Sequence, residues 1–111
     1  MTDTADNLHA LAVDMPARAP ELLRWLLPEP LTLGRLVEQR EAVMRWDASD
    51  PESWRHHCAL RTTLYDLQAA ASVGAITLLG GAFTLAGDWR PAVELYDRIA
   101  RRGAGDRQPP C

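Results

Sequence analysis

The chain has 111 residues, of which 47% are hydrophobic, and a formal net charge of -3. This length predicts one domain with a modest core, and the acidic balance argues against a broad nucleic-acid-binding surface. All twelve basic residues are arginine, which excludes lysine-based nucleophilic or Schiff-base chemistry. Together with the many alanines, this usage suggests a high-GC bacterial genome. Leucine and alanine dominate the apolar residues, so the composition favours an all-α fold.

The N-terminal part of the chain predicts a series of short helices. The first, within residues 1–15, follows from apolar residues at helical spacing. Pro20 can open a second helix that reaches Leu27, because proline is well tolerated in a first turn. Thr32 can cap a third helix that runs to about Trp46.

A fourth helix is predicted to begin at Pro51, with Asp50 as its cap, and to reach at least Ala71. The apolar stripe that starts at Leu60 continues at alternating spacings of four and three residues as far as residue 85. One helix or two over 51–86 are therefore both compatible with the pattern.

The segment 75–103 predicts two helices that fold back on each other at Gly87-Asp88. The second has an apolar stripe formed by Trp89, Ala92, Val93, Tyr96, Ile99 and Ala100. Asp97 and Arg101 form a favourable i,i+4 pair, and Gly103 supplies a stop. In the first helix, Gly80 costs about 1 kcal/mol relative to alanine, which predicts that it lets the second helix approach closely.

Five residues of this segment match the tetratricopeptide repeat in type and mutual spacing, namely Leu79, Gly80, Phe83, Ala92 and Tyr96. That family is built from helix hairpins of about 34 residues, and Gly87-Asp88-Trp89 resembles its turn. The resemblance covers under a third of the chain, has no second copy, and departs from the family at Ile76 and Ala104. It implies a packed helix hairpin that includes Trp89, and it leaves open either plain core packing or a peptide-binding groove.

The sequence His56-His57-Cys58 has the residue types of a metal site. Consecutive helical residues point about 100° apart, so these three side chains cannot share one ion, and a closed zinc site needs about four ligands. We interpret them as surface histidines beside a core cysteine. Cys58 and Cys111 form no disulfide framework, which fits a reduced cytoplasm. We predict no catalytic residue, metal or cofactor, and hence no enzyme.

A charge-free run of nineteen residues, 69–87, is long enough to permit a membrane span. Only six of its residues are Val, Ile, Leu or Phe, and four are Gly, so a buried hairpin is the favoured interpretation. The acidic N-terminal sequence lacks the apolar region of a secretory signal, which predicts a cytoplasmic protein.

Two sets of apolar residues are candidate partner-binding surfaces, because tryptophan is enriched in binding hot spots and a short helix cannot bury all of its sides. They are Leu22, Leu23, Trp25, Leu26 and Leu27 in the second helix, and the tryptophans Trp46 and Trp54. Ordinary core packing is the alternative for both sets.

We therefore expect an all-α fold over residues 1–103, a small bundle of four to six helices that ends in an antiparallel helix hairpin, followed by a disordered tail at 104–111. The expected function is non-catalytic binding to another protein or to a second copy, as an adaptor, regulator or assembly factor. The alternatives are a single-span membrane protein using 69–87 and a helical inhibitor or subunit of a nucleoprotein complex. No small-molecule substrate is expected, and the partner, pathway and stoichiometry stay open.

Overall fold

The structure, a computed structural model, describes residues 3–15 and 18–106. Within these residues the chain forms five α-helices, one short π-helical stretch and three strands. In order they are α1 (Thr4–His9), η1 (Ala10–Asp14), α2 (Ala19–Trp25), β1 (Leu31–Thr32), α3 (Leu33–Val43), α4 (Glu52–Ser72), β2 (Ile76–Leu79), β3 (Ala82–Leu85) and α5 (Arg90–Asp106). The predicted predominance of helix is confirmed, but the fold is not all-α, because the three strands form a small antiparallel sheet.

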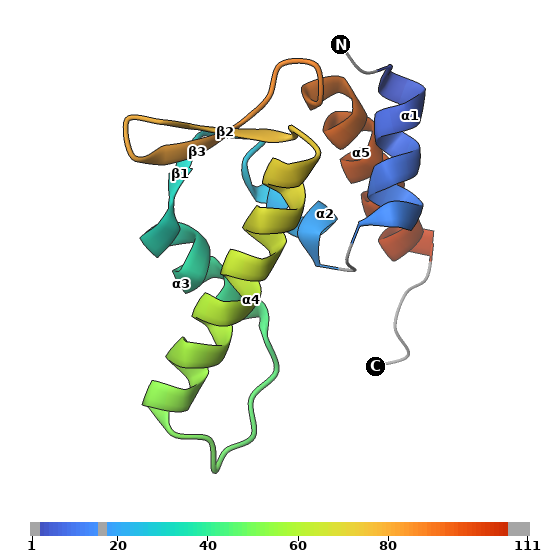
Figure 1. The fold of residues 1–111 in the computed structure, drawn as a ribbon. Helices are drawn as coiled ribbons and strands as arrows, with labels where there is room; N and C mark the ends of the chain where they lie inside the picture. The colour runs from blue at the N-terminus through green and yellow to red at the C-terminus, as the bar shows by residue number, and fades with distance from the viewer. Residues whose placement is uncertain (1–2, 16–17, 107–111) are drawn as a thin grey trace.

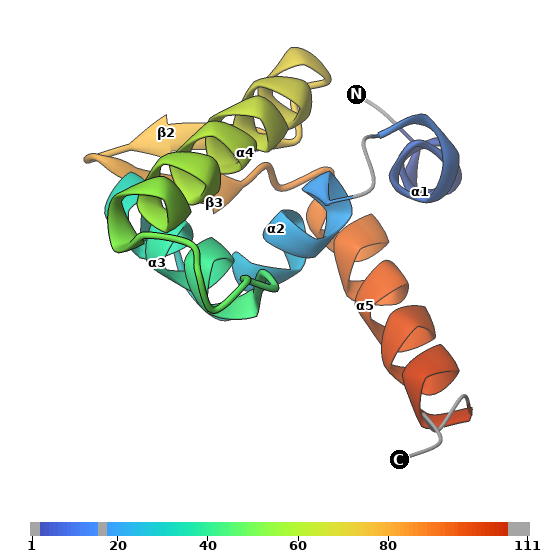
Figure 2. The same ribbon diagram turned by 90° about the horizontal axis from the view of Figure 1, so that it is seen from below.

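The helices form two packed pairs joined by α2. Helix α4, with 21 residues, packs on α3, and α5 packs on α1, while α2 touches both α4 and α5. Figure 2 shows the α3–α4 pair and the α1–α5 pair on opposite sides of α2. The sheet lies at the end of α4 that leads into β2 (Figure 1).

Helix α2 lies at the centre of the core. Leu22, Leu23 and Leu26 are all 0% exposed, and Trp25 and Leu27 pack partly buried against the same cluster. Of the two interpretations of this segment, ordinary core packing therefore describes Leu22, Leu23 and Leu26, which leave no exposed surface for a partner. The physical reason is that α4, α5 and η1 surround α2, and a helix that is apolar on most sides is stable when neighbours cover those sides.

Residues 75–86, expected to be helical, contain a β-hairpin instead. Strands β2 and β3 pair through Ile76↔Leu85 and Leu79↔Ala82, and Gly80 and Gly81 form the turn with φ of 59° and 81°. A two-residue hairpin turn with positive φ at both positions is of the kind that glycine favours. The predicted antiparallel helix hairpin is thus not present among the described residues. A Cβ placed on Gly80 would have no atom within 4 Å, so Gly80 serves the turn and not a helix contact.

The two-helix interpretation of 51–86 is replaced by one helix followed by the hairpin. Helix α4 ends at Ser72, and Gly74 adopts φ 77° directly after it. The N–H groups of Gly74 and Ala75 donate to the carbonyls of Ala71 and Ala70 at 3.0 and 2.9 Å. This pair of bonds is a Schellman motif, which satisfies carbonyls at the helix end. Of the two open interpretations, the helix therefore ends before Gly74 and does not continue to residue 86.

The ends of α3 and α4 differ only slightly from those predicted from capping residues. Thr32 caps α3 as predicted, since its hydroxyl accepts from the Arg35 N–H at 3.3 Å, but α3 ends at Val43, short of Trp46. Pro51 occupies the N-cap position of α4. Asp50 is not the cap, because its carboxylate accepts from the backbone N–H of Asp47 at 2.9 Å in the preceding turn.

Helix α5 follows the predicted stripe over its first turns. Trp89 and Val93 are buried, but Ile99, predicted to share their face, is 55% exposed. The helix continues to Asp106, past the predicted stop at Gly103. The rest of the predicted tail, 107–111, lies outside the described residues.

The charge-free run 69–87 is divided between the end of α4 and the hairpin. Across residues 3–15 and 18–106, the helices lack the combination of length and apolar character that crossing a bilayer requires.

Candidate functional site

The face of α4 that packs against the core differs from the apolar stripe predicted from Leu60 onward. Its buried residues are Ala59, Thr63, Asp66, Leu67 and Ala70, which are mostly small or polar. The apolar stripe predicted from Leu60 onward lies at the edge of this face, and Leu64 is 46% exposed. Leu64 is thus directed outward, while a threonine and an aspartate share the inward face with Leu67.

A buried ion pair explains this orientation of α4. The Arg40 guanidinium on α3 donates from Nη2 to Oδ2 of Asp66, and the two side chains are only 1% and 4% exposed. Arg40 also lies over the Trp25 ring, 5.1 Å from its centroid, which adds a cation–π contact. Burial raises the pKa of the Asp66 carboxyl and lowers the pKa of the Arg40 guanidinium, against their mutual attraction. The pair holds Asp66 against α3 and so sets the rotation of α4.

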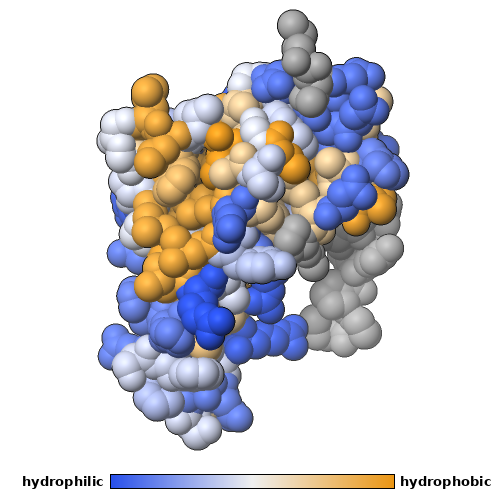
Figure 3. All heavy atoms as spheres, viewed as in Figure 1, coloured by the Kyte–Doolittle hydropathy of each residue, from blue (hydrophilic) through white to orange (hydrophobic). Residues whose placement is uncertain are grey.

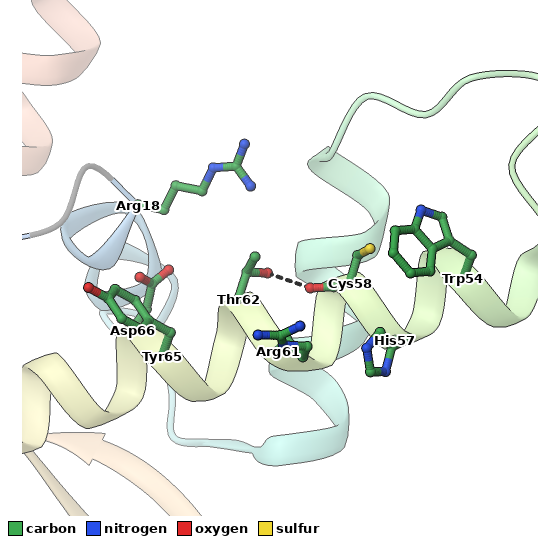
Figure 4. A pocket seen from close by; sticks show the side chains of 8 residues that line it. All are labelled: Arg18, Trp54, His57, Cys58, Arg61, Thr62, Tyr65 and Asp66. Atoms are coloured by element: carbon green, nitrogen blue, oxygen red, sulfur yellow. Dashed lines mark hydrogen bonds between the residues drawn. The ribbon is translucent and has the colours of Figure 1, made fainter.

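Helix α4 contributes most of the residues that line a groove of about 470 Å³. Its lining consists of Trp54, His57, Cys58, Arg61, Thr62, Tyr65 and Asp66 from α4 and Arg18 from the residue before α2. We call this feature the α4 groove. In Figure 4, Trp54, Cys58 and Thr62 project from the same side of α4, and the Arg18 side chain extends over the space next to them.

Aromatic side chains stand toward the two ends of the α4 groove. Trp54 is 52% exposed and stacks on His57 with ring centroids 5.9 Å apart, and Tyr65 is 64% exposed. Between them, the half-buried Cys58 accepts through its carbonyl a hydrogen bond from the Thr62 hydroxyl at 2.9 Å. The tryptophan, the cysteine and the tyrosine lie four and seven residues apart, a spacing that aligns them along one side of a helix.

The charges at the α4 groove are mainly positive. Arg18 and Arg61 line it, and within the described part of the chain neither forms an ion pair. The one carboxylate in the lining, that of Asp66, is already paired with Arg40. The groove therefore offers two arginine cations beside aromatic surface, an arrangement suited to carboxylates next to apolar groups.

The histidines and the cysteine of α4 do not form a metal site. His56 points toward α3, with Nδ1 3.9 Å from the Glu41 carboxylate, while His57 and Cys58 line the groove. Among the residues that the structure describes, no group of three or more His, Cys, Asp or Glu is placed to hold an ion. Cys58 is half-buried in the groove, so its assignment to the core is corrected: the Arg40–Asp66 pair rotates its side of α4 outward.

The remaining predicted site residues are dispersed. Trp46 is half-buried and its indole N–H donates to the Glu41 carbonyl at 2.9 Å, which holds the loop after α3. Of the six residues assigned to the helix hairpin, Trp89, Ala92, Phe83 and Tyr96 belong to the core or pack against it. Leu79 is 77% exposed beside the hairpin turn, and Gly80 is part of that turn.

Sequence reasoning identified Trp54 but missed Arg18, Arg61 and Tyr65. The spacing of Trp54, Cys58, Arg61 and Tyr65 at i, i+4, i+7 and i+11 was the available signal, but it crosses the competing leucine stripe. Comparisons with protein-family models, with curated proteins and with solved structures found no match to this chain.

Proposed function

We propose that this chain is a non-catalytic protein-binding domain and that it presents the outer face of α4 to a partner protein. The observation that carries the proposal is the orientation of α4: Thr63 and Asp66 are buried, while Trp54 and Tyr65 are 52% and 64% exposed. Helices of monomeric proteins usually bury their large apolar residues first. Aromatic residues and arginines left together on a surface are the types most enriched in binding hot spots.

The apolar surface next to the α4 groove supports a protein partner over a small molecule. Figure 3 shows hydrophobic surface that extends over the β-hairpin and the adjoining half of α4. Leu64, on α4, is 46% exposed. Extended exposed apolar surface of this kind is typical of protein contact sites.

The chemistry of the α4 groove favours an amphipathic helix with acidic flanks as the occupant. The groove follows α4 from Trp54 to Tyr65, so a second helix can place an apolar stripe along it. The cations of Arg18 and Arg61 then attract carboxylates beside that stripe. The free thiol of Cys58 and the exclusive use of arginine fit a bacterial cytoplasmic setting for this binding.

A pair of designed peptides tests the binding chemistry. Both are helical, with leucines at i, i+3, i+4 and i+7, but one carries glutamates and the other arginines beside the stripe. We expect the acidic peptide to bind in fluorescence anisotropy, with an affinity that falls as salt is added, and the basic peptide to bind at least about tenfold more weakly. Arg18→Glu with Arg61→Glu should reverse this preference.

Co-purification from the native host tests whether a natural partner uses the same surface. Trp54→Glu with Tyr65→Glu should lose a partner that the unmodified chain retains. Val13→Glu is the matched control, because Val13 on η1 is 65% exposed and lies outside the groove lining. If the groove variant and the control retain the same proteins, and neither designed peptide binds, the α4 groove is not a partner site.

A further inference from the structure

Strand β2 is an outer strand of the sheet, whose order is β1-β3-β2. The Ala86 N–H donates to the Ala75 carbonyl at 2.9 Å, and hydrogen-bonded pairs alternate along an antiparallel ladder. The hydrogen-bonded pairs are therefore Ala75 with Ala86, then every second residue along β2, which gives Thr77 and Leu79. The backbone N–H and C=O groups of Thr77 and Leu79 thus point toward β3. The N–H and C=O of Leu78 therefore point to the outer edge, where no strand of the described chain pairs with them.

The side chain of Leu78 is also left uncovered. It lies on the same face of the sheet as its cross-strand partner Phe83 and as Ile76, which belongs to the core. Ile76 is 8% exposed but Leu78 is 62% exposed, so the core ends before the tip of the hairpin. On the opposite face, Leu79 is 77% exposed. The tip of β2 thus combines an open backbone edge with exposed leucines.

This edge lacks three of the features that normally limit strand addition. Natural proteins protect edge strands with charged residues, prolines or bulges. The run 69–87 contains neither a charged residue nor a proline, and β2 pairs with β3 in an unbroken register. Figure 1 shows β2 along the outer side of the hairpin, away from α3 and β1.

We propose that a second copy of this chain occupies the β2 edge, through antiparallel pairing of β2 with β2 of the partner. The result is one continuous sheet with three strands from each copy. Antiparallel pairing about a two-fold axis at Leu78 lets its N–H donate to the carbonyl of the partner's Leu78, and the reverse. The two Leu78 side chains then lie next to each other on one face of the sheet.

The absence of charge is a reason to place the contact between two copies at this edge. Each copy carries a net charge of -3, so two copies repel each other at long range. Residues 69–87 are free of charge, so pairing through the hairpin places no charged side chains of the two β2 strands opposite each other. The α4 groove, with its two arginines, has the opposite character, so the self-pairing edge and the partner groove are separate surfaces.

Hydrogen exchange and sedimentation test the pairing together. We expect the chain to sediment as a dimer at high concentration and as a monomer on dilution. The Leu78 amide should become protected from exchange only as the dimer forms, while the Thr77 and Leu79 amides are protected in both states by β3. A chain that stays monomeric, or that forms a dimer with an unprotected Leu78 amide, would overturn the proposal.

Charge-swapped variants test the two-fold register. Leu78→Lys and Leu78→Glu should each be monomeric, since like charges meet at the axis, and an equimolar mixture should recover the dimer. Ile99→Lys is the matched control and should dimerise normally, because Ile99 is similarly exposed, at 55%, but lies on α5. Circular dichroism checks that each variant keeps its fold. A mixture that stays monomeric would contradict pairing at Leu78, and equal loss in the Ile99→Lys control would place the contact elsewhere.

Discussion

The guanidinium of Arg40 and the carboxylate of Asp66 bind each other in the interface between α3 and α4, almost fully screened from solvent. Within the described residues the Nε of Arg40 has no hydrogen-bond partner, so the desolvation of this cation is only partly compensated. The pair consequently determines the orientation of α4 more than it stabilises the fold.

Removing one member of this pair should cost far more than replacing both. We expect Arg40→Met alone to lower the free energy of unfolding by about 3–5 kcal/mol, because it leaves the Asp66 carboxylate buried without a partner. Arg40→Met with Asp66→Leu should recover most of that loss, since both charges are then gone. Urea unfolding of the two variants measures the difference. A double variant as unstable as the single one would show that the pair is a net source of stability.

The pH dependence of stability should have opposite signs at Asp66 and Asp97. Burial raises the pKa of the Asp66 carboxyl above its ordinary value of 3.8. The contribution of this shift to the free energy of unfolding is therefore complete below pH 3.8 and is lost as pH rises through the raised pKa. The hydrogen bond from Arg24 Nε, 2.8 Å long, lowers the pKa of Asp97. The contribution of the Asp97 shift to the free energy of unfolding is present above pH 3.8 and is lost as pH falls through the lowered pKa.

Urea unfolding across the acidic range, compared between the unmodified chain and Asp66→Asn or Asp97→Asn, measures these two slopes. NMR titration of the two carboxyl groups provides the control, because it reports each pKa directly. Slopes of the same sign would contradict the assigned causes.

Substitutions at the hairpin turn should depend on backbone conformation and not on space. Gly80 has φ 59° and no obstructing atom within 4 Å. We expect Gly80→Asn to change stability by at most a few tenths of a kcal/mol, because asparagine tolerates this conformation. Gly80→Val should cost about 1–2 kcal/mol, because a β-branched residue does not. Thermal unfolding of the two variants measures the difference. If Gly80 were instead a contact between helices, any added side chain would overpack that contact, and both variants would lose stability according to the size of the side chain.

Two tryptophans should differ strongly in their contribution to stability. Trp89 is 3% exposed within the core, whereas Trp54 is 52% exposed in the α4 groove. We expect Trp89→Ala to lower the free energy of unfolding by about 3–5 kcal/mol and Trp54→Ala to lower it by less than about 1 kcal/mol. Equal losses in chemical denaturation would mean that Trp54 is part of the folded core.

Signals carried by neighbouring residues predicted much of the helical structure. Pro20 marks the start of α2 and Thr32 caps α3, because capping depends on a few adjacent side chains. The Asp97–Arg101 pair also forms as predicted, with Nε and Oδ2 2.9 Å apart. Such contacts lie within one or two helical turns, so a sequence pattern can reveal them.

The β-hairpin and the rotation of α4 could not be predicted from signals carried by neighbouring residues. Apolar residues at 76, 79 and 83 also fit a helical stripe, which predicts Gly80 as a helix contact, whereas the Gly80-Gly81 pair is a hairpin signal. The rotation of α4 depends on Arg40 and Asp66, which are 26 positions apart. The burial of Leu22, Leu23 and Leu26 likewise depends on α4 and α5, which follow much later in the chain.

The contact between α1 and α5 has a consequence for synthesis of the chain. Asn7, only 2% exposed, donates from its amide to the Asp88 carbonyl at 3.1 Å, 81 positions further on. At ordinary translation speeds the ribosome needs about 4–16 s to cover that distance. During this interval α1 and the leucines of α2 lack Trp89 and Val93 as packing partners. The nascent chain therefore holds the core leucines of α2 without these partners for seconds, a state in which we expect molecular chaperones to bind it.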